Sequence, residues 1–405
     1  MLQICNNYSC KWRFEYNASK CAVIVFNESK NDYSKQNRKW QMGNNLIMEG
    51  INYTHLGIIL NKYFNINDNV QQACNKFRST ILSICNTGQF NVHTLLSLYK
   101  SIVLPTCLYG CELWDTLSAT NSAQLQRAQM FCLKVIQKLP LTANNSIVLN
   151  AAGVLSLRGE INYRKLGFLG QLVRLPSKYL SKQMFVHRIV RYDSGITKQK
   201  YGFIPDICRI LHEYELYDSL VTFLKTAIFP SKRTWKSIVR SQIWEKEFAQ
   251  RKANKPQKLT LTYFNRLFYA DRPCMFWEML RENYMSRNTC YAAVYILCKL
   301  FSGKYPLKCG ECERLVDDIV LHRICFCSAN DNIRKILWTN IIESSGMNGF
   351  LHLMKKDAFT QILDCIAGLE VHNASDSSSS LCTLIPDRSE VAIIHNMLSI
   401  HKSVN

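Results

Sequence analysis

The sequence predicts an α+β fold that is mostly helical, with one small antiparallel sheet near the N-terminus. Short β-branched apolar runs occur within residues 1–66 and are typical of strands. From about Asn67 onward, apolar residues recur every three or four positions, which is the spacing of one helix face. Of the 405 residues 47% are hydrophobic, so the chain can bury a large core and divide into several compact units. We expect these units at residues 1–66, 67–195, 196–300, 301–345 and 346–405.

The predicted sheet rests on three short segments. Residues 21–26 form an apolar, β-branched run that indicates a buried strand. Residues 46–48 and 53–60 flank Gly50 and are predicted to pair as a hairpin around it. The sheet is therefore expected to be small and to precede all the helices.

Two helices stand out in residues 67–195. The apolar residues of 92–103 lie at helical spacing, and Pro105 is predicted to end that helix. In the second helix, Asn121 offers a cap, and Arg127 and Lys134 are expected opposite the apolar face. That face consists of Leu125, Ala128, Cys132, Val135, Ile136 and Leu139.

Residues 163–175 continue the helical pattern, with Gly159, Gly167 and Gly170 in or beside it, and close helix packing is one reason for such glycines. The polar stretch 193–202 breaks the pattern and suggests a boundary. Residues 375–380 have the sequence SDSSSS and are predicted to be a flexible linker before a short tail.

The charge of the chain points to a polyanionic partner. Its 50 Lys and Arg residues and 30 Asp and Glu residues give a formal net charge of +20. Such a surface binds RNA or DNA by releasing condensed counterions, while an anionic membrane is the competing interpretation. The longest apolar runs, 21–26 and 292–298, are too short to cross a bilayer. We expect no membrane partner.

The compartment is expected to be reducing, in the nucleus or the cytoplasm. The N-terminus lacks the apolar region of a secretory signal. The 18 cysteines are spread along the chain, and several, such as Cys107, Cys132 and Cys298, lie in apolar segments typical of buried thiols.

Residues 309–327 carry the sharpest local motif. Cys309 and Cys312 form a CxxC pair, and His322 and Cys327 follow after a short gap. Two thiolates on one turn, completed by a His and a Cys on a helical turn, can form a closed tetrahedral Zn²⁺ site. Cys325 is an alternative fourth ligand. The other interpretation is a set of reduced, half-buried thiols in a cysteine-rich chain.

Residues 232–258 are strongly basic and contain interleaved aromatic residues. Trp235 or Trp244 could stack on unpaired bases while the basic side chains follow a phosphate backbone. The alternative is a solvated helix face whose tryptophans pack inward. The candidate binding residues here are Lys232, Arg233, Lys236 and Arg240.

Three stretches, in this order, resemble the non-LTR (LINE-type) retrotransposon reverse transcriptases. CKWRFEYNASKCAVIVF matches the end of the family's palm, INYTHLGIIL its primer-grip hairpin, and LYKSIVLPTCLYGCELW its early thumb. The family also has a C-C-H-C zinc knuckle after the thumb, and its spacing favours Cys327 over Cys325. The matching residues are Trp12, Asn17, Lys20, Tyr53, Leu56, Gly57, Tyr99, Pro105, Tyr109, Gly110 and Trp114. Any one of these residues would equally suit an ordinary core.

The resemblance implies a palm remnant, a helical thumb, a basic helical region and a zinc-knuckle unit that together grip template and primer. Tyr53, Leu56 and Gly57 would approach the primer, with Arg127 and Lys134 on the thumb. Lys20 would be a general acid in such an enzyme; the alternative is a solvated lysine on a surface strand, which is the more common case.

The resemblance also implies that catalysis is missing from this chain. Nucleotidyl transfer requires two Mg²⁺ ions held by aspartates, which in the family precede the Trp12 region. The strings containing Asp317–Asp318 and Asp271–Arg272 do not lie where the palm strand belongs. We therefore expect no polymerase activity without the polymerase and endonuclease parts of the same element. The alternative function is a non-enzymatic helical nucleic-acid-binding or scaffold protein with a structural zinc site.

Overall fold

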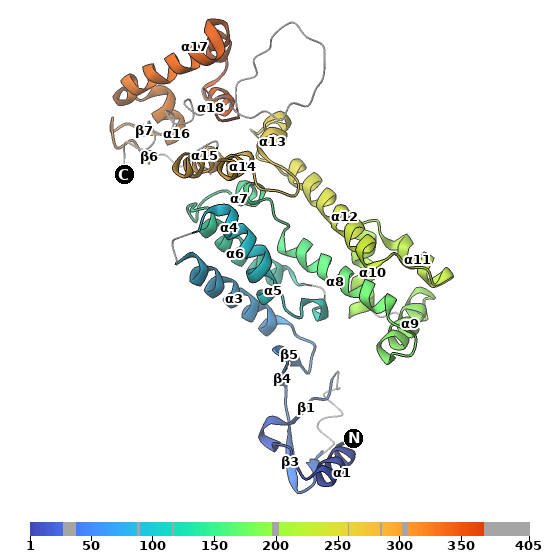
Figure 1. Ribbon diagram of the computed structural model, residues 1–405. Helices are drawn as coiled ribbons and strands as arrows, with labels where there is room; N and C mark the ends of the chain where they lie inside the picture. Colours follow the sequence, from blue (N-terminus) through green and yellow to red (C-terminus); the bar gives the residue numbers. More distant parts are fainter. Residues whose placement is uncertain are drawn as a thin grey trace.

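The computed structural model describes residues 1–26, 38–86, 90–115, 117–196, 202–257, 259–283, 286–301 and 307–367. Helices dominate this part of the chain and the strands are few and short, as the sequence predicts. The molecule is elongated, with the N-terminal strands at one end and helix α17 at the other (Figure 1). Within the described residues, no helix is both long and apolar enough to cross a bilayer.

The N-terminal unit begins with a helix, α1 (Leu2–Trp12), that the sequence patterns did not predict. Its three-stranded sheet has the order β1-β3-β2 and is mixed, because β1 runs parallel to β3 while β2 runs antiparallel to it. The expected buried strand over residues 21–26 is reduced to two residues, of which Ala22 is exposed and Val23 half-buried. The strands are β1 (Ala22–Val23), β2 (Trp40–Met42) and β3 (Asn45–Glu49).

The hairpin predicted between residues 46–48 and 53–60 does not form, because β3 pairs with β1 and β2; a different hairpin lies within residues 52–61. Strands β4 (Asn52–His55) and β5 (Ile58–Asn61) pair antiparallel, with Leu56 and Gly57 at the tip. Leu56 has a φ of 49° and Gly57 a φ of 81°, so both tip residues are left-handed, as a tight two-residue turn requires. Gly50 instead lies between β3 and β4, and its N–H donates to Val23 O.

Helical structure continues through Pro105, contrary to the sequence prediction. Helix α4 (Val92–Leu98) passes into a π-helical turn, Tyr99–Val103, and then into α5 (Leu104–Cys107). Proline lacks an N–H and clashes with the carbonyl four residues earlier. The wider turn just before Pro105 accommodates both defects, so the helix continues to Cys107.

Helix α6 (Ala119–Ile136) has its cap three residues before the predicted one. Ser118 is the cap, and its side chain accepts a hydrogen bond from the Asn121 N–H. Asn121 is itself buried and donates from Nδ2 to Asn67 Oδ1 at 3.0 Å, linking α6 to the start of α3 (Asn67–Cys85). The predicted polar face is also wrong at Lys134, which is only 6% exposed.

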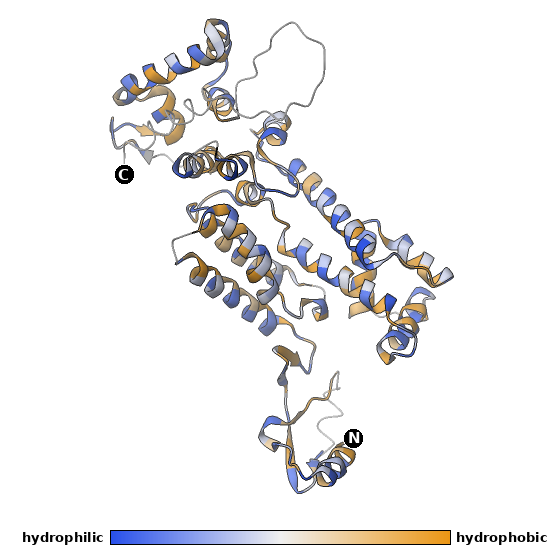
Figure 2. Cartoon of the chain, viewed as in Figure 1, coloured by the Kyte–Doolittle hydropathy of each residue, from blue (hydrophilic) through white to orange (hydrophobic). Residues whose placement is uncertain are grey.

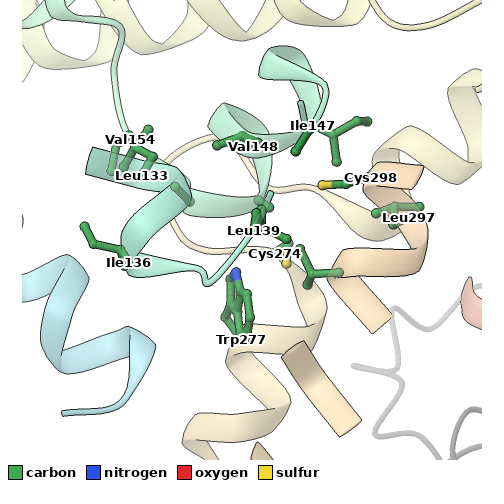
Figure 3. Close-up of a cluster of buried hydrophobic side chains, with 14 of the residues drawn as sticks. Leu133, Ile136, Leu139, Ile147, Val148, Val154, Cys274, Trp277, Leu297 and Cys298 are labelled. Atoms are coloured by element: carbon green, nitrogen blue, oxygen red, sulfur yellow. The ribbon is translucent and has the colours of Figure 1, made fainter. Parts of the chain in front are cut away.

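The first hydrophobic core joins residues far apart in the sequence. It combines α3 to α7 with α13 to α18, so residues 70–161 and 259–366 share one interior. Trp277 from α14 belongs to the same buried cluster as Leu133, Ile136 and Leu139 (Figure 3), and its Nε1 donates to Gln137 Oε1 at 3.0 Å. The helices are α7 (Asn145–Ala152), α13 (Leu261–Leu267), α14 (Met275–Arg281), α15 (Arg287–Leu300), α16 (Ile319–Leu321), α17 (Asp331–Met354) and α18 (Ala358–Ala367).

The second core is formed by helices α8 to α12. Its residues come from both before and after the polar stretch 193–202 in the sequence. Two glycines allow α8 and α12 to approach closely: a Cβ at Gly170 would lie 2.4 Å from the Trp235 ring, and one at Gly159 would lie 2.1 Å from Glu247. Gly167 has no such neighbour. The helices are α8 (Leu157–Arg174), α9 (Leu180–Asp193), α10 (Phe203–Glu213), α11 (Tyr217–Thr226) and α12 (Lys232–Ala253).

Hydropathy alternates around these helices, with polar residues outside and apolar residues toward the two cores (Figure 2). The expectation of buried thiols is confirmed for Cys107, Cys132 and Cys298, which are at most 3% exposed. The Ser-rich linker predicted at residues 375–380 lies outside the described residues.

Candidate metal centre and basic surfaces

The first half of the candidate metal centre is a short hairpin. Strands β6 (Leu307–Lys308) and β7 (Leu315–Val316) pair antiparallel, and Cys309 and Cys312 lie in the segment that connects them. The Cys309 N–H donates to Arg314 O at 2.8 Å, and the Glu313 N–H donates to Cys309 O at 2.9 Å. Glu313 has a left-handed φ of 59°, which reverses the chain. Both thiols are therefore held on one tight turn.

The second half comes from the helical segment after the hairpin. Asp318 caps α16 by accepting hydrogen bonds from the N–H groups of Val320 and Leu321, both at 3.1 Å. A π-helical turn, His322–Phe326, follows, and the Cys327 N–H donates to His322 O at 2.6 Å. This wide turn places Cys327 close to His322.

The four predicted ligands converge. The ligand atoms of Cys309, Cys312, His322 and Cys327 all lie within 4.8 Å of one another, so the group could hold a metal ion. Cys309 Sγ lies 3.9 Å from Cys327 Sγ, and Cys312 Sγ lies 3.0 Å from His322 Nε2. Zinc–sulfur bonds of about 2.3 Å at tetrahedral angles place two sulfurs about 3.8 Å apart. The separation of the first pair fits this value.

The surroundings of the site favour the metal-binding forms of two ligands. Burial raises the pKa of Cys309, but hydrogen bonds from the backbone of Cys312 and Glu311 and from the neighbouring thiols outweigh it and lower that pKa to about 7. The lowered pKa of Cys309 favours its thiolate, the form that binds metals. Burial and the neighbouring thiols raise the pKa of Cys327 to about 11. Burial, and then the positive charges of Arg314, Arg323 and Arg334, lower the pKa of His322. A neutral imidazole has a lone pair to donate.

Cys325, the alternative fourth ligand, does not join the group. It packs against the first hydrophobic core, and burial raises its pKa to about 11. The structure therefore brings Cys327, and not Cys325, together with the other three residues.

The segment that carries the four ligands, residues 307–327, packs against the first core. Val320 and Ile324, each 1% exposed, belong to that core. Arg334 from α17 donates to Ile324 O at 2.9 Å and to Cys327 O at 2.5 Å. The sequence motif identified the ligands but missed Arg334, because its role depends on the packing of α17.

The chain matches no protein-family model, no curated protein and no solved structure. Its function therefore has to be argued from the sites themselves.

The basic residues of α12 form an exposed stripe. Lys232, Lys236 and Arg240 follow one another at four-residue spacing, and Arg233 lies beside them; all four are exposed. Positive side chains in a row along one side of a helix are suited to bind successive phosphates of a nucleic-acid strand. We call these four residues the α12 stripe.

The tryptophans of α12 pack inward, so the stacking interpretation is wrong for them. Trp235 is 0% exposed, and its Nε1 donates to Leu166 O at 2.8 Å. Trp244 is 8% exposed and belongs to the second core. These rings are therefore closed to unpaired bases.

On α6, the two predicted binding residues differ in exposure. Arg127 is exposed, and its Nε donates to Ala123 O of the preceding turn at 3.3 Å. Lys134 is buried, and its Nζ donates to Leu141 O at 2.7 Å. Burial lowers the pKa of Lys134. Its ammonium therefore satisfies a carbonyl after the helix and does not reach the surface, so it is unsuited to a phosphate contact.

Lys20 and the hairpin residues occupy the N-terminal unit. Lys20 is exposed, and its carbonyl accepts a hydrogen bond from Tyr53 Oη at 3.0 Å. Leu56, at the tip of the β4–β5 hairpin, is 75% exposed. A Cβ at Gly57 would lie 3.9 Å from the Tyr109 ring. The hairpin tip is thus a surface feature next to the end of α5.

Both aspartate strings that could imitate a catalytic strand lie in connecting segments. Asp318 caps α16, and Asp317 precedes it after β7. Asp271 lies between α13 and α14, next to Arg272, whose guanidinium carbon is 4.0 Å from the Tyr269 ring centroid. Neither string lies on a strand paired with β1 to β5.

Proposed function

We propose that this chain is the C-terminal part of a LINE-type reverse transcriptase that grips nucleic acid without the catalytic aspartates. The observation that carries the proposal is the meeting of the three resembling stretches in space. Tyr53 of the hairpin stretch bonds to Lys20 of the first stretch. A Cβ at Gly110, in the third stretch, would lie 2.7 Å from Ile58 of the hairpin stretch. Stretches that form one working surface in a polymerase should lie together in this way.

We also propose that Zn²⁺ is the ion held by the four converging ligands. Three sulfurs and one imidazole nitrogen are the ligands that zinc prefers in structural sites. When bound, the ion would cross-link the β6–β7 hairpin to the segment containing His322 and Cys327. Four protein ligands fill a tetrahedral site, so its role is structural.

The polymerase reaction requires parts that this chain does not supply. The Mg²⁺ ions of a complete enzyme would be held by aspartates of the palm, and neither aspartate string here is placed for that role. Purified protein with Mg²⁺ or Mn²⁺ should therefore not extend a primer. Robust incorporation of nucleotides would overturn this part of the proposal.

The binding part is tested by affinity for nucleic acids of different structure. A chain derived from a polymerase grip should bind a primer–template junction more tightly than a blunt duplex of equal length, because the hairpin and thumb meet where the two strands separate. The affinity should fall steeply with salt, because the release of condensed counterions is less favourable at a higher salt concentration. Equal affinity for junction and duplex would contradict the proposed origin from a polymerase, but it would leave the proposed nucleic-acid binding in place.

One observation favours the alternative, a helical nucleic-acid-binding or scaffold protein with a structural zinc site. Helix α1 ends at Trp12, where the resemblance implies a residue just after a strand, and the β4–β5 hairpin forms its own two-stranded sheet. In that case the basic surfaces would bind RNA and DNA with the same affinity whether or not they contain a primer–template junction. The same junction and duplex measurements distinguish the two functions.

A further inference from the structure

An exposed group of aromatic side chains lies at the end of α1. Tyr8, Trp12 and Phe14 are 54%, 62% and 40% exposed. The ring centroid of Tyr8 is 6.2 Å from that of Trp12 and 6.0 Å from that of Phe14. Phe14 lies 5.1 Å from Tyr16. The four rings form one continuous group, which we call the aromatic platform.

The backbone fixes this arrangement. Arg13 adopts a left-handed φ of 56° after the last residue of α1, and its N–H donates to Cys10 O at 3.3 Å. The Phe14 N–H donates to Ser9 O at 3.1 Å. This pair of bonds is the Schellman motif, in which the residue after the left-handed one folds back onto the last turns of the helix. Phe14 is thereby placed beside Tyr8.

The charges around the platform are mostly positive. Lys11, Arg13 and Lys20 are exposed, and Glu15 is the single acidic residue in residues 1–26. Cations beside exposed rings complement a partner that combines anionic groups with flat apolar faces. Single-stranded nucleic acid has both features, because each unpaired base exposes a π face next to a phosphate.

The platform is also joined through a short chain segment to the hairpin to which we assign nucleic-acid binding. The chain runs from Tyr16 to Lys20, whose carbonyl accepts the hydrogen bond from Tyr53 of the β4–β5 hairpin. The segment 16–20 thus links the platform to the β4–β5 hairpin.

We propose that the aromatic platform stacks the unpaired bases of a single strand, with Lys11 and Arg13 binding its phosphates. This inference rests on the proposed function and adds the site at which the unpaired strand is held. It also gives the molecule the base-stacking surface that α12 lacks, since Trp235 and Trp244 are buried.

Trp12 makes the proposal directly measurable. The chain has seven tryptophans, all within the described residues, and Trp12 is the one that is exposed. Stacking of a base on an indole quenches its fluorescence. Titration of the full chain with single-stranded oligo(dT) at low salt should quench tryptophan emission, with the same Kd as the anisotropy of the labelled oligonucleotide.

Three variants identify the ring. Trp12→Phe should remove most of the quenching while binding persists, because phenylalanine still stacks. Trp12→Ala should remove the quenching and weaken binding about tenfold, as expected for the loss of one stacked base. Trp338→Phe, which alters a half-buried tryptophan of α17, is the matched control and should keep the quenching.

The outcomes separate the platform from the proposed function. If anisotropy reports binding but the emission is unchanged, or the quenching survives in Trp12→Phe, the platform is wrong and the proposed function stands. If no oligonucleotide or duplex binds at low salt, the proposed function fails and the platform with it. A dimer that is lost in Trp12→Ala, without quenching in the wild type, would make the platform a protein-docking surface and overturn the inference.

Discussion

At the scale of single residues, the metal centre depends on thiols that differ sharply in their surroundings. Cys309 Sγ lies 3.9 Å from Cys327 Sγ, whereas Cys325 packs into the first core. Cys309→Ser should therefore lower the zinc content per chain strongly, because a closed site loses one of its four ligands. Elemental analysis of the purified protein measures this directly.

Cys325→Ser is the matched control, since it removes a sulfur from the π-helical turn that carries His322 without removing a ligand. It should retain the zinc content of the wild type. Equal zinc in all three proteins, or zinc in none of them, would contradict the assignment.

Gly153 is a position where only glycine fits. Its φ is 55°, and a Cβ there would lie 2.0 Å from the backbone oxygen of Arg272. Gly153→Ala should lower the free energy of unfolding by at least about 2 kcal/mol, because left-handed strain adds to a clash with a second backbone. Gly167→Ala, at a helical glycine with nothing within 4 Å, should instead be neutral or stabilise by up to about 1 kcal/mol. Denaturant unfolding compares the two, and a similar loss in both would refute the packing argument.

At the scale of elements, a buried carboxylate joins α12 to the start of α8. Glu247 Oε2 accepts from the Ser156 N–H at 2.9 Å, and Oε1 accepts from Ser156 Oγ. Arg251 donates to Glu247 Oε2 at 2.9 Å and to Val154 O at 2.6 Å. Glu247→Ala would leave the Arg251 guanidinium buried without its counter-ion, so we expect a loss of about 3–5 kcal/mol in the free energy of unfolding.

Glu245→Ala is the control for this prediction, because it removes an exposed carboxylate from the same helix. It should change the free energy of unfolding by less than about 0.5 kcal/mol. Chemical denaturation of both variants against the wild type measures the difference, and equal effects would count against the network.

A second buried carboxylate, Asp206, should make stability depend on acid. Burial raises the pKa of Asp206, but Lys165, whose Nζ lies 2.6 Å from Oδ2, and Arg209 outweigh it and lower that pKa. Since the folded pKa is below the unfolded value, the ionised carboxylate stabilises the fold above the unfolded pKa. That contribution is lost as the pH falls through the folded pKa.

We therefore expect the free energy of unfolding to fall more steeply below about pH 4 in the wild type than in Asp206→Asn. Urea unfolding at several acidic pH values measures both slopes. Parallel curves would contradict the assignment.

Sequence patterns predicted the helices of this chain better than the details within them. The apolar spacing of α6 and the CxxC motif depend on neighbours within a few residues, so the sequence shows them. Continuation through Pro105 depends on a π-helical turn that no local pattern indicates. The inward direction of Trp235 and Lys134 depends on which neighbour supplies a carbonyl, and that neighbour is set by tertiary packing.

At the scale of the whole molecule, the two cores do not follow the order of the chain. The second core takes its residues from between Leu155 and Trp244, while the first core joins residues 70–161 to residues 259–366. Periodicity shows which face of a helix is apolar but not which helix covers it. The polar stretch 193–202 therefore indicated a boundary, although helices on its two sides, α9 and α10, pack in one core.

The net charge of +20 is a property of the whole chain. The α12 stripe is the place where we predict that some of these positive charges bind phosphates. Replacing Lys232 and Lys236 together by glutamine should weaken nucleic-acid binding and make it less dependent on salt. Each lost phosphate contact reduces the slope of log K against log salt by about 0.7–0.9. Lys335 and Lys355, both exposed on or beside α17, allow a control pair with the same change in net charge. If the stripe binds phosphates, the two pairs of substitutions will differ in slope. If only the overall charge matters, both pairs will reduce the affinity equally, because a long-range field does not distinguish where the charges were removed.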